Sequence, residues 1–510
     1  MTLRLAPFHD LGLDEPALRR LLDDQADRAA FLHRLWSYYR NPLSPTPNAH
    51  AHSTNSSAPA GRWYDLAQAA ALPTRLRRAD RPADHAVVEN DIAWRIDALV
   101  DFVFGKPVRV RSEAADPDLR SRIEAVLERV LENSGGMPLL RDAALLGSVH
   151  GWVDLILRTD DLSRPTHAAP ELGPAPRTRD PLERAAAALR IELVEAPRSA
   201  VLLDPADYRR IRAYIIRPNP ADPAADPPAR RHPTLARLAK LSRPRPRHTA
   251  QDDPAADHLE ILSAYHQQLY TRGRLLRDAP NPLRALPVVH VQNGSQPLRY
   301  EGVSDVEPLI PLQDELNARL SDRAHRVTLQ SFNMYLAKGL DNVIGAGGVA
   351  DVAPGRVWAT DNPDAEITSF GGDGHSPSET QHIDEIREAL DKASSVSPAV
   401  LGVIRAKLGH LSSVNALRIT MQGVLAKTER KRAAYGRGVA EVLRLALHAL
   451  DHAGVLRTRP EDRGVKLEFE DPLPESEDER LAAALKKRDL GVPADTILRE
   501  LGYDADPVVT

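Results

Sequence analysis

The chain has 510 residues, more than the ~250 to 300 at which one hydrophobic core stops growing, so two or more domains or an elongated subunit are expected. It contains no cysteine, which excludes disulfides and thiolate metal sites and suits a reducing compartment. A net charge of -4, from 67 basic and 71 acidic residues, argues against a protein whose whole surface binds nucleic acid, while local basic patches remain compatible with it.

The N-terminal 85 residues are predicted to hold a helix and a flexible connector. Residues 41–61, NPLSPTPNAHAHSTNSSAPAG, are small, polar and proline-rich, which is typical of such a connector. His50 and His52 lie in it and are interpreted as solvated side chains rather than metal ligands. No apolar run reaches the ~20 residues of a membrane span, and the first residues include acids where a signal peptide is apolar. A soluble intracellular product without membrane contact is expected.

An α/β region is expected over residues 86–302. Residues 90–104, NDIAWRIDALVDFVF, place five aliphatic side chains on one helical face, and Gly105 ends that helix. Further helices are predicted at 118–132 and 138–149, and strands at 108–111, 152–157, 191–196, 211–216, 258–266 and 288–292. Residues 218–257 are acidic and proline-rich, then basic. They are interpreted as a disordered insertion, with contact to DNA or a partner as the alternative.

Helices dominate after residue 303. Ser304 and Glu307 have capping-box spacing, but neighbouring prolines favour a helix that starts at Pro311 and runs to residue 333. Glycine-rich turns follow over 334–373, with short strands such as 356–359. A second helix is predicted over 378–393, begun by the sequence Ser-Pro-Ser-Glu.

The longest predicted helix covers residues 412–452. It has an apolar stripe, and its three glycines at 423, 436 and 438 indicate a possible bend. A strand at 466–470 and two short helices that begin near Ser476 and Pro493 complete the chain.

No catalytic or metal-binding motif is found. Phe104-Gly105-Lys106-Pro107 lacks the first glycine and the hydroxyl of a phosphate loop. His382, Asp384 and Glu385 could form a carboxylate site, although a solvated helix face is the preferred interpretation. The N-x-S matches at Asn55 and Asn293 have no meaning without a secretion signal. The sequence therefore predicts a protein that is not an enzyme and needs no cofactor or metal.

The stretch SPAVLGVIRAKLGHLSSVNALRI, residues 397–419, separates two predicted helices, yet its first fifteen residues follow neither a helix nor a strand period. Its turn-forming residues are Pro398, Gly402 and Gly409, and its basic residues are Arg405, Lys407 and His410. The glycines are expected to let this loop change shape, with ordinary helix termination as the alternative.

The helices that bracket residues 334–373 can pack as an antiparallel hairpin that projects from the α/β region. Each has a narrow apolar stripe that would bury little surface alone: Leu316, Leu320 and Val327 on the first, and Ile383, Ile386 and Leu390 on the second. Neighbouring copies could supply the missing partners, and head-to-tail packing that closes produces a ring.

From about residue 90 to 503 the chain resembles the portal proteins of tailed double-stranded DNA bacteriophages and prophages. The likeness lies in NDIAWRIDALVDFVFGKPVRV, LPVVHVQNG, SDVEPLIPLQDELNARLSD and SPAVLGVIRAKLGHLSSVNALRITMQGVLAKTERKR. These motifs consist of apolar, small and turn residues without an invariant catalytic side chain, so the likeness rests on their order and spacing. One departure is Ser412-Ser413-Val414-Asn415, where portals commonly have a glycine, which leaves the start of the long helix open.

The resemblance implies an α+β, mainly helical and elongated subunit. Its expected parts are an unassigned N-terminal segment (1–85), an α/β wing (86–302) with the insertion at 218–257, a first stem helix (303–333), a clip (334–373), a second stem helix (374–395), a tunnel loop (396–411), a long wing helix with a strand (412–472) and a helical crown (473–510).

The implied function is a ring of typically twelve copies at one capsid vertex, through which double-stranded DNA is packaged and later ejected. The implied partners are the terminase large subunit, a head-completion or tail adaptor, and the major capsid and scaffolding proteins. The protein would assemble in the host bacterial cytoplasm and remain in the virion.

Two sets of charged residues would matter in such a channel. Arg405, Lys407 and His410 are the hypothesis for DNA-facing groups, and bonds within the loop or to neighbouring subunits are the alternative. Acidic stem residues would repel phosphates wherever they face inward; they are Glu379, Asp384, Glu385, Glu388 and Asp391.

Two other classes of function stay open. A DNA-packaging enzyme subunit, a nuclease or an ATPase, is disfavoured by the missing phosphate loop and the lack of a convincing carboxylate cluster. A monomeric helical adaptor that binds partners through its proline-rich segments is the other.

Overall fold

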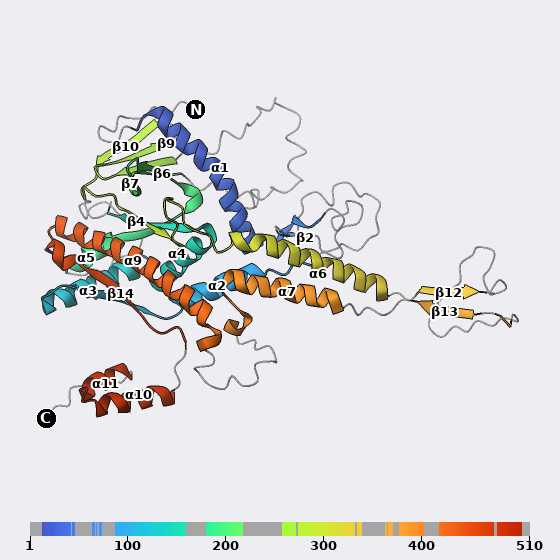
Figure 1. Cartoon of the computed structure of the whole chain (residues 1–510). Coiled ribbons are helices and arrows are strands. Elements are labelled where there is room, and N and C mark those ends of the chain that lie inside the picture. The colour runs from blue at the N-terminus through green and yellow to red at the C-terminus, as the bar shows by residue number, and fades with distance from the viewer. Residues whose placement is uncertain are drawn as a thin grey trace, which may run out of the picture.

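The computed structural model describes residues 13–41, 43–45, 64–66, 68, 71–73, 87–159, 180–217, 258–271, 274–331, 334–338, 363–364, 366–370, 377–401, 418–473 and 477–501. The insertion at 218–257, the strand expected at 356–359 and most of the connector lie outside these residues. Helices and small sheets form a body, from which a helix pair projects toward a two-stranded hairpin (Figure 1). The expected class, α+β and mainly helical, is confirmed.

Periodic apolar residues account for the first helices of the body. These are α1 (Glu15–Arg40), α2 (Asp91–Phe104), α3 (Pro117–Asn133), α4 (Gly136–His150) and α5 (Pro181–Ala188). The aliphatic face predicted for α2 is buried: Ile92 and Ile96 are 0% exposed and Leu99 is 1% exposed. Asn90 caps this helix, because its side chain accepts a hydrogen bond from the Ala93 amide.

Three sheets form the rest of the body. The largest has the antiparallel order β10-β9-β8-β7-β6, the second is β11-β4-β5 and the third is β14-β3. Their strands are β3 (Val108–Ser112), β4 (Trp152–Arg158), β5 (Arg190–Glu195), β6 (Ser199–Asp204), β7 (Asp207–Ile216), β8 (His258–Ser263), β9 (His266–Thr271), β10 (Arg274–Pro280), β11 (Val288–Gln292) and β14 (Val465–Phe469). A further antiparallel pair joins β1 (Leu43–Pro45) and β2 (Tyr64–Leu66).

The single strand predicted at 258–266 is wrong, because the chain reverses at Ser263. The Ser263 hydroxyl accepts hydrogen bonds from the amides of Tyr265, at 3.3 Å, and His266, at 2.9 Å. This side chain therefore makes a turn that separates β8 from β9.

The projecting helix pair consists of α6 (Ile310–Ser331) and α7 (Pro377–Ser394), which lie side by side in Figure 1. A short 3-10 turn, η6 (Glu307–Leu309), precedes α6. The Ser304 hydroxyl accepts hydrogen bonds from the Val306 and Glu307 amides at 3.0 and 3.3 Å, so the predicted cap serves this turn. Between the helices, β12 (Met334–Lys338) pairs antiparallel with β13 (Glu366–Phe370).

The apolar stripe of the helix pair is covered unevenly. Leu316 and Leu390 are 0% exposed, and they belong to the main core of the body. Val327, farther along α6, is 49% exposed. The base of the helix pair is therefore part of the body, whereas its distal part leaves an apolar side chain open.

The longest helix is α9 (Gln422–His452), which is continuous over its whole length. The helix expected from residue 412 is interrupted by a turn at Met421, and 412–417 lie outside the described part. A Cβ at Gly438 would stand 2.2 Å from Cγ2 of Val291, and one at Gly436 would stand 3.2 Å from Cε2 of Phe469. Close approach of β11 and β14 therefore explains these two glycines, which were predicted to allow a bend.

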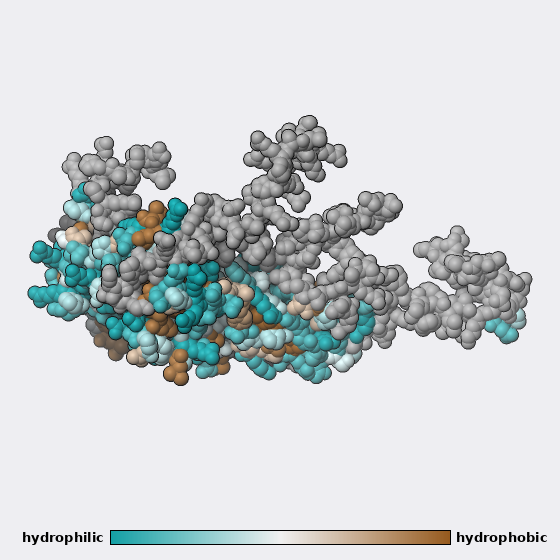
Figure 2. Space-filling view, turned by 90° about the horizontal axis from the view of Figure 1, so that it is seen from above, coloured by the Kyte–Doolittle hydropathy of each residue, from teal (hydrophilic) through white to brown (hydrophobic). Residues whose placement is uncertain are grey.

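The chain ends with α10 (Glu477–Asp489) and α11 (Ala494–Glu500), as the two short predicted helices require. Figure 1 shows this pair apart from the body. Among the described helices, none is long and apolar enough to cross a membrane. Figure 2 shows one face of the molecule as mostly hydrophilic with scattered apolar areas.

Gly438→Ala is expected to lower the free energy of unfolding by about 1 to 3 kcal/mol, because the new methyl group overlaps Val291 in a packed interface. The control is Gly423→Ala in the same helix, where the nearest atom, the Ser395 carbonyl oxygen, would lie 3.6 Å away. Helix propensity should make that control neutral or slightly stabilising. Denaturant unfolding of both variants measures the difference, and equal stabilities would contradict the packing argument.

Candidate functional site: the polar anchor between α7 and α9

The segment between α7 and α9 is the site predicted from the sequence. Gly402, Arg405, Lys407, Gly409 and His410 all lie outside the described residues, so their roles stay predictions. Pro398 is described and begins a 3-10 turn, η7 (Pro398–Leu401), in which the Val400 amide donates to the Ser397 carbonyl at 3.0 Å. The loop expected to be aperiodic therefore begins with one short turn. The geometry that can be described is that of its two ends.

The end of α7 is bound by Arg95 of α2, a side chain that is 1% exposed. Its guanidinium lies 2.8 Å from the Asp91 carboxylate and 2.7 Å from the Asp391 carboxylate. It also donates to the Ser394 hydroxyl at 3.1 Å and to the Val396 carbonyl. One buried cation therefore holds the last turn of α7 and the first residues after it.

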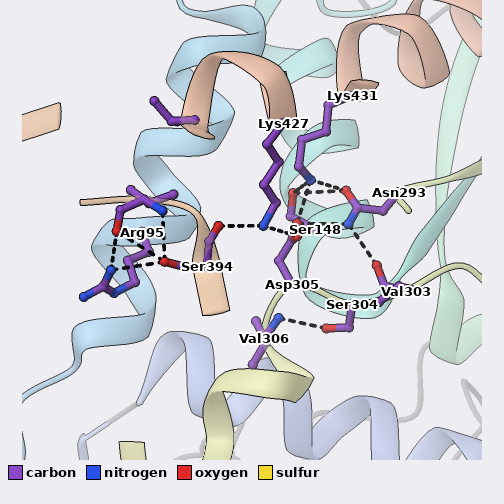
Figure 3. Close-up of polar contacts among 12 residues, drawn as sticks. Arg95, Ser148, Asn293, Val303, Ser304, Asp305, Val306, Ser394, Lys427 and Lys431 are labelled. Carbon is purple, nitrogen blue, oxygen red and sulfur yellow. Dashed lines mark hydrogen bonds and ion pairs between the residues drawn. The ribbon is translucent and has the colours of Figure 1, made fainter. Parts of the chain in front are cut away.

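The start of α9 is bound at the same place by Lys427 and Lys431. The Lys427 ammonium donates to the Ser394 carbonyl at 2.9 Å and lies 2.8 Å from Oδ1 of Asp305. The Lys431 ammonium lies 2.6 Å from Oδ2 of Asp305 and donates to the Ser148 hydroxyl at 2.9 Å and to the Asn293 side-chain oxygen (Figure 3). Ser394 thus contacts Arg95 through its hydroxyl and Lys427 through its carbonyl.

Asp305 brings a third element into this network. It follows Ser304 at the entry to α6, and its backbone amide donates to the Ser148 carbonyl at 2.8 Å. The side-chain amide of Asn293 donates a hydrogen bond to the Asp305 carboxylate at 2.9 Å. We call the network the polar anchor; it consists of Arg95, Ser148, Asn293, Asp305, Ser394, Lys427 and Lys431. It joins the entry to α6, the end of α7 and the start of α9 to the body.

Burial and charge pairing act in opposite directions on Asp305. Burial alone would raise the pKa of its carboxyl, but Lys431 and Lys427 outweigh burial and hold the pKa well below its usual range. Burial lowers the pKa of the Lys431 ammonium, and Asp305 offsets that effect only in part. The carboxylate is therefore ionised at neutral pH, and its two cationic partners depend on it.

The chemistry of the polar anchor is structural. Its cations bind carboxylates, hydroxyls and carbonyls of the same chain, and no group of three or more His, Asp or Glu residues that could hold a metal occurs in the described ranges. Lys106, noted in the incomplete phosphate-loop pattern, donates to the carbonyls of Asp471 and Leu473. His382 is half-exposed, with Nε2 3.7 Å from the Glu315 carboxylate across the helix pair.

The acidic residues of α7 fall into two groups. Glu379 pairs with Arg326 of α6, and Asp391 pairs with Arg95. Asp384, Glu385 and Glu388 are exposed and line a shallow groove along α7. Three of the five acidic residues that the sequence analysis singled out on this helix are therefore exposed to solvent.

Sequence reasoning missed the polar anchor, although part of its signal was present. Lys431 continues the spacing of the apolar stripe of α9 between Val424 and Val439, and it is buried with them. Arg95 interrupts the apolar face of α2 in the same way. A cation at an apolar position indicates a buried partner. The partner itself, Asp305, lies far away in the sequence and has no local signal.

Asp305→Asn is expected to lower the free energy of unfolding by about 3 to 5 kcal/mol, because two lysines would lose their buried counter-charge. The matched double variant, Asp305→Leu with Lys431→Met, should recover part of this loss since it leaves less unpaired charge. Denaturant unfolding at neutral pH measures both. A stable Asp305→Asn variant would show that the lysines do not depend on the carboxylate.

The lowered pKa of Asp305 also predicts a pH dependence. Because the folded-state pKa lies below the unfolded value of about 3.9, the stabilisation is complete well above that pH and is lost as the pH falls below it. Between about pH 4 and the folded-state pKa, the stability of the parent protein should fall more steeply than that of Asp305→Asn. Parallel curves from chemical denaturation at a series of acidic pH values would contradict this assignment.

Comparison with known proteins adds a family. Residues 270–505 match the model of the family described as phage portal protein, SPP1 Gp6-like. Curated proteins give no match. Two solved structures are similar over 80% of this chain and 89% of their own: the neck of an empty gene transfer agent particle computed with C6 symmetry, with 12% identity and a TM-score of 0.41, and the virion of a native gene transfer agent particle, with 13% identity and a TM-score of 0.36.

The family match begins within β9 and extends past α11, so it includes the helix pair and, of the polar anchor, Asn293, Asp305, Ser394, Lys427 and Lys431. The expected resemblance to portal proteins is confirmed. Residues 270–505, a little under half of the chain, are similar to the SPP1 Gp6-like family of phage portal proteins.

Proposed function

We propose that this protein is the portal subunit of a tailed phage or related particle. Copies of it form a ring at one vertex of the capsid, double-stranded DNA is packaged through the ring and later leaves through it, and the ring connects head to tail. The observation that carries the proposal is the family match over residues 270–505. The role is structural, and the chemistry of DNA translocation belongs to a partner.

The proposed division of the subunit follows the order of its elements. Residues 86–302 with 412–472 are the wing, 303–333 and 374–395 the stem, 334–373 the clip, 396–411 the tunnel loop and 473–510 the crown. The helix pair α6 and α7 and the β12–β13 hairpin beyond it support the assignments of stem and clip (Figure 1). The clip is proposed to contact the terminase large subunit and then the tail adaptor, and the wing to contact capsid and scaffolding proteins.

In a ring, a neighbouring copy would cover the exposed surface of the helix pair α6 and α7. The distal part of α6 exposes Val327, and α7 presents Asp384, Glu385 and Glu388. Head-to-tail packing places one face of each subunit against a different face of its neighbour, so such surfaces need not complement themselves.

The polar anchor is proposed to hold the tunnel loop. Ser394 and Val396 on one side and Lys427 on the other are bound to the body, and the proposed loop lies between these two ends. Arg405, Lys407 and His410 are proposed to face DNA. A few cations at a constriction give weak, sequence-independent contact with phosphates, which lets DNA slide.

Assembly is the first test. Native mass spectrometry and negative-stain microscopy of the full chain should show a closed ring of about twelve copies with a central hole. A strictly monomeric protein would contradict the portal proposal and favour a helical adaptor. ATP hydrolysis or DNA cleavage by the purified chain would instead support the packaging-enzyme alternative.

Deletion of residues 400–409 is expected to leave rings intact and to reduce DNA packaging or retention, because the deleted segment lies between the two bound ends of the loop. The triple variant Arg405→Gln, Lys407→Gln and His410→Gln tests charge alone. Arg459→Gln, an exposed arginine elsewhere on the body, is its control. Unchanged packaging by the deletion variant would make the loop a mere connection.

A further inference from the structure

A cleft of about 730 Å³ lies on the body. Its walls are α9, β11 with the residues on either side of it, and the first half of β7. Five arginines line it: Arg209, Arg210, Arg299, Arg437 and Arg444. Among the described residues that line it, Glu441 alone is acidic. We call it the arginine cleft.

Most of this positive charge has no counter-charge within the described part of the chain. Glu441 is already paired with Arg444, whose Nε donates to it at 2.9 Å. Arg210 is 3.9 Å from the Asp204 carboxylate, at the limit of an ion pair. Arg299 and Arg437 are exposed and form no ion pair with any residue of the described ranges.

The acidic residue beneath the arginine cleft, Asp154, does not neutralise the charge of the arginines. His290 lines the cleft, and beneath it lies Asp154, which is 0% exposed. The Asp154 carboxylate is 2.7 Å from Nδ1 of His290 and accepts hydrogen bonds from the hydroxyls of Tyr214, at 2.8 Å, and Tyr300, at 3.0 Å. Its oxygens are therefore occupied by three partners, so within the described part of the chain Asp154 leaves Arg299 and Arg437 available to an external anion.

Size and chemistry restrict that anion. A cleft of this volume falls in the range that encloses a small ligand or a short chain segment, about 300 to 1,000 Å³. It is small for a DNA duplex, whose major groove alone is about 12 Å wide. Guanidinium groups bind carboxylates in a bidentate manner, so an acidic peptide fits both constraints.

The chain itself has such a segment. Residues 475–479, ESEDE, hold four acids at the entry to α10. This helix packs on α11, and Figure 1 shows the two helices apart from the body. Leu481 and Leu485 of α10 are about half exposed. The acidic segment therefore adjoins α10, a helix whose apolar side chains are not fully covered by the described residues of the same copy.

We propose that the arginine cleft binds the acidic segment 475–479 of a neighbouring copy, through Arg299 and Arg437. This inference rests on the proposed ring, in which identical copies meet head to tail. Contacts between exposed charges steer association and weaken with salt. The interaction would thus help neighbouring copies find the correct orientation.

The absence of cysteine from the sequence makes cross-linking a direct test. Ser295→Cys, which lines the arginine cleft, and Ser476→Cys, within the acidic segment, leave every proposed charge in place. They are made in separate chains, mixed, assembled and treated with a short bismaleimide, which spans more than the ~7 Å Cα separation that a disulfide allows. Dimers should form at least about fivefold more than with Arg459→Cys as the partner of Ser476→Cys, because docking raises the effective concentration of the thiols. Arg459 is 81% exposed and lies outside the arginine cleft.

The outcomes separate this inference from the proposed function. Rings without the Ser295→Cys to Ser476→Cys cross-link would overturn the inference and leave the portal proposal intact, whereas the absence of rings would overturn the portal proposal. A third chain carries both substitutions. If cross-links form only within this chain and not between the two single variants, docking between copies is contradicted. Binding of inorganic tripolyphosphate without any cross-link would make the arginine cleft a small-anion site instead. Thermal unfolding of each variant confirms that its fold is retained.

Discussion

The contact of Asp305 with Lys427 and Lys431 is the interaction on which the rest of the arrangement depends. A carboxylate at the entry to α6 and two ammonium groups at the start of α9 share one buried position. Buried charges are tolerated only when their partners are in place, so the two helices cannot shift relative to each other without a large cost in free energy. Ser394 extends this constraint to the end of α7, because its carbonyl accepts from Lys427. Three helices that are distant in the sequence therefore meet with one fixed geometry.

This constraint divides the molecule into a fixed base and a less covered outer part. Near the base, Leu316 and Leu390 join the core of the body, so the helix pair is packed as well as bonded there. Farther out, Val327 is half exposed. The base of the helix pair is therefore held by packing and by buried charge, whereas its distal part is less covered by the described residues of the same copy.

The sequence predicted those helices that have a periodic apolar face. The apolar period located α2, α4, α6 and α7, because each of these helices buries one face. The reversal at Ser263 was missed, since the apolar alternation continues through the turn and the hydrogen bonds of one hydroxyl decide it. The glycines of α9 were visible, but the close approach of β11 and β14 that requires them is a tertiary fact.

The candidate site was predictable in a similarly limited way. Sequence located the segment between α7 and α9, and the charges at Lys431 and Arg95 stood at apolar positions. Their partner Asp305 could not be deduced, because pairing across long sequence separation leaves no periodic trace. The basic residues of the loop, Arg405, Lys407 and His410, lie outside the described part of the chain, so their assignment still rests on the resemblance alone.

The chain has buried charges that are paired within one copy and exposed charges that are not, and this difference matters for the proposed assembly. In the polar anchor every cation is matched by a partner of the same copy, which is the arrangement that stability demands of buried charge. In the arginine cleft, Arg299 and Arg437 have no ion-pair partner among the described residues, while residues 475–479 and the exposed side chains Asp384, Glu385 and Glu388 of α7 are acidic. A net charge of only -4 thus conceals surfaces of opposite sign. Identical copies with such separated surfaces can attract one another head to tail without strong overall repulsion, which is what a closed ring of one kind of subunit requires.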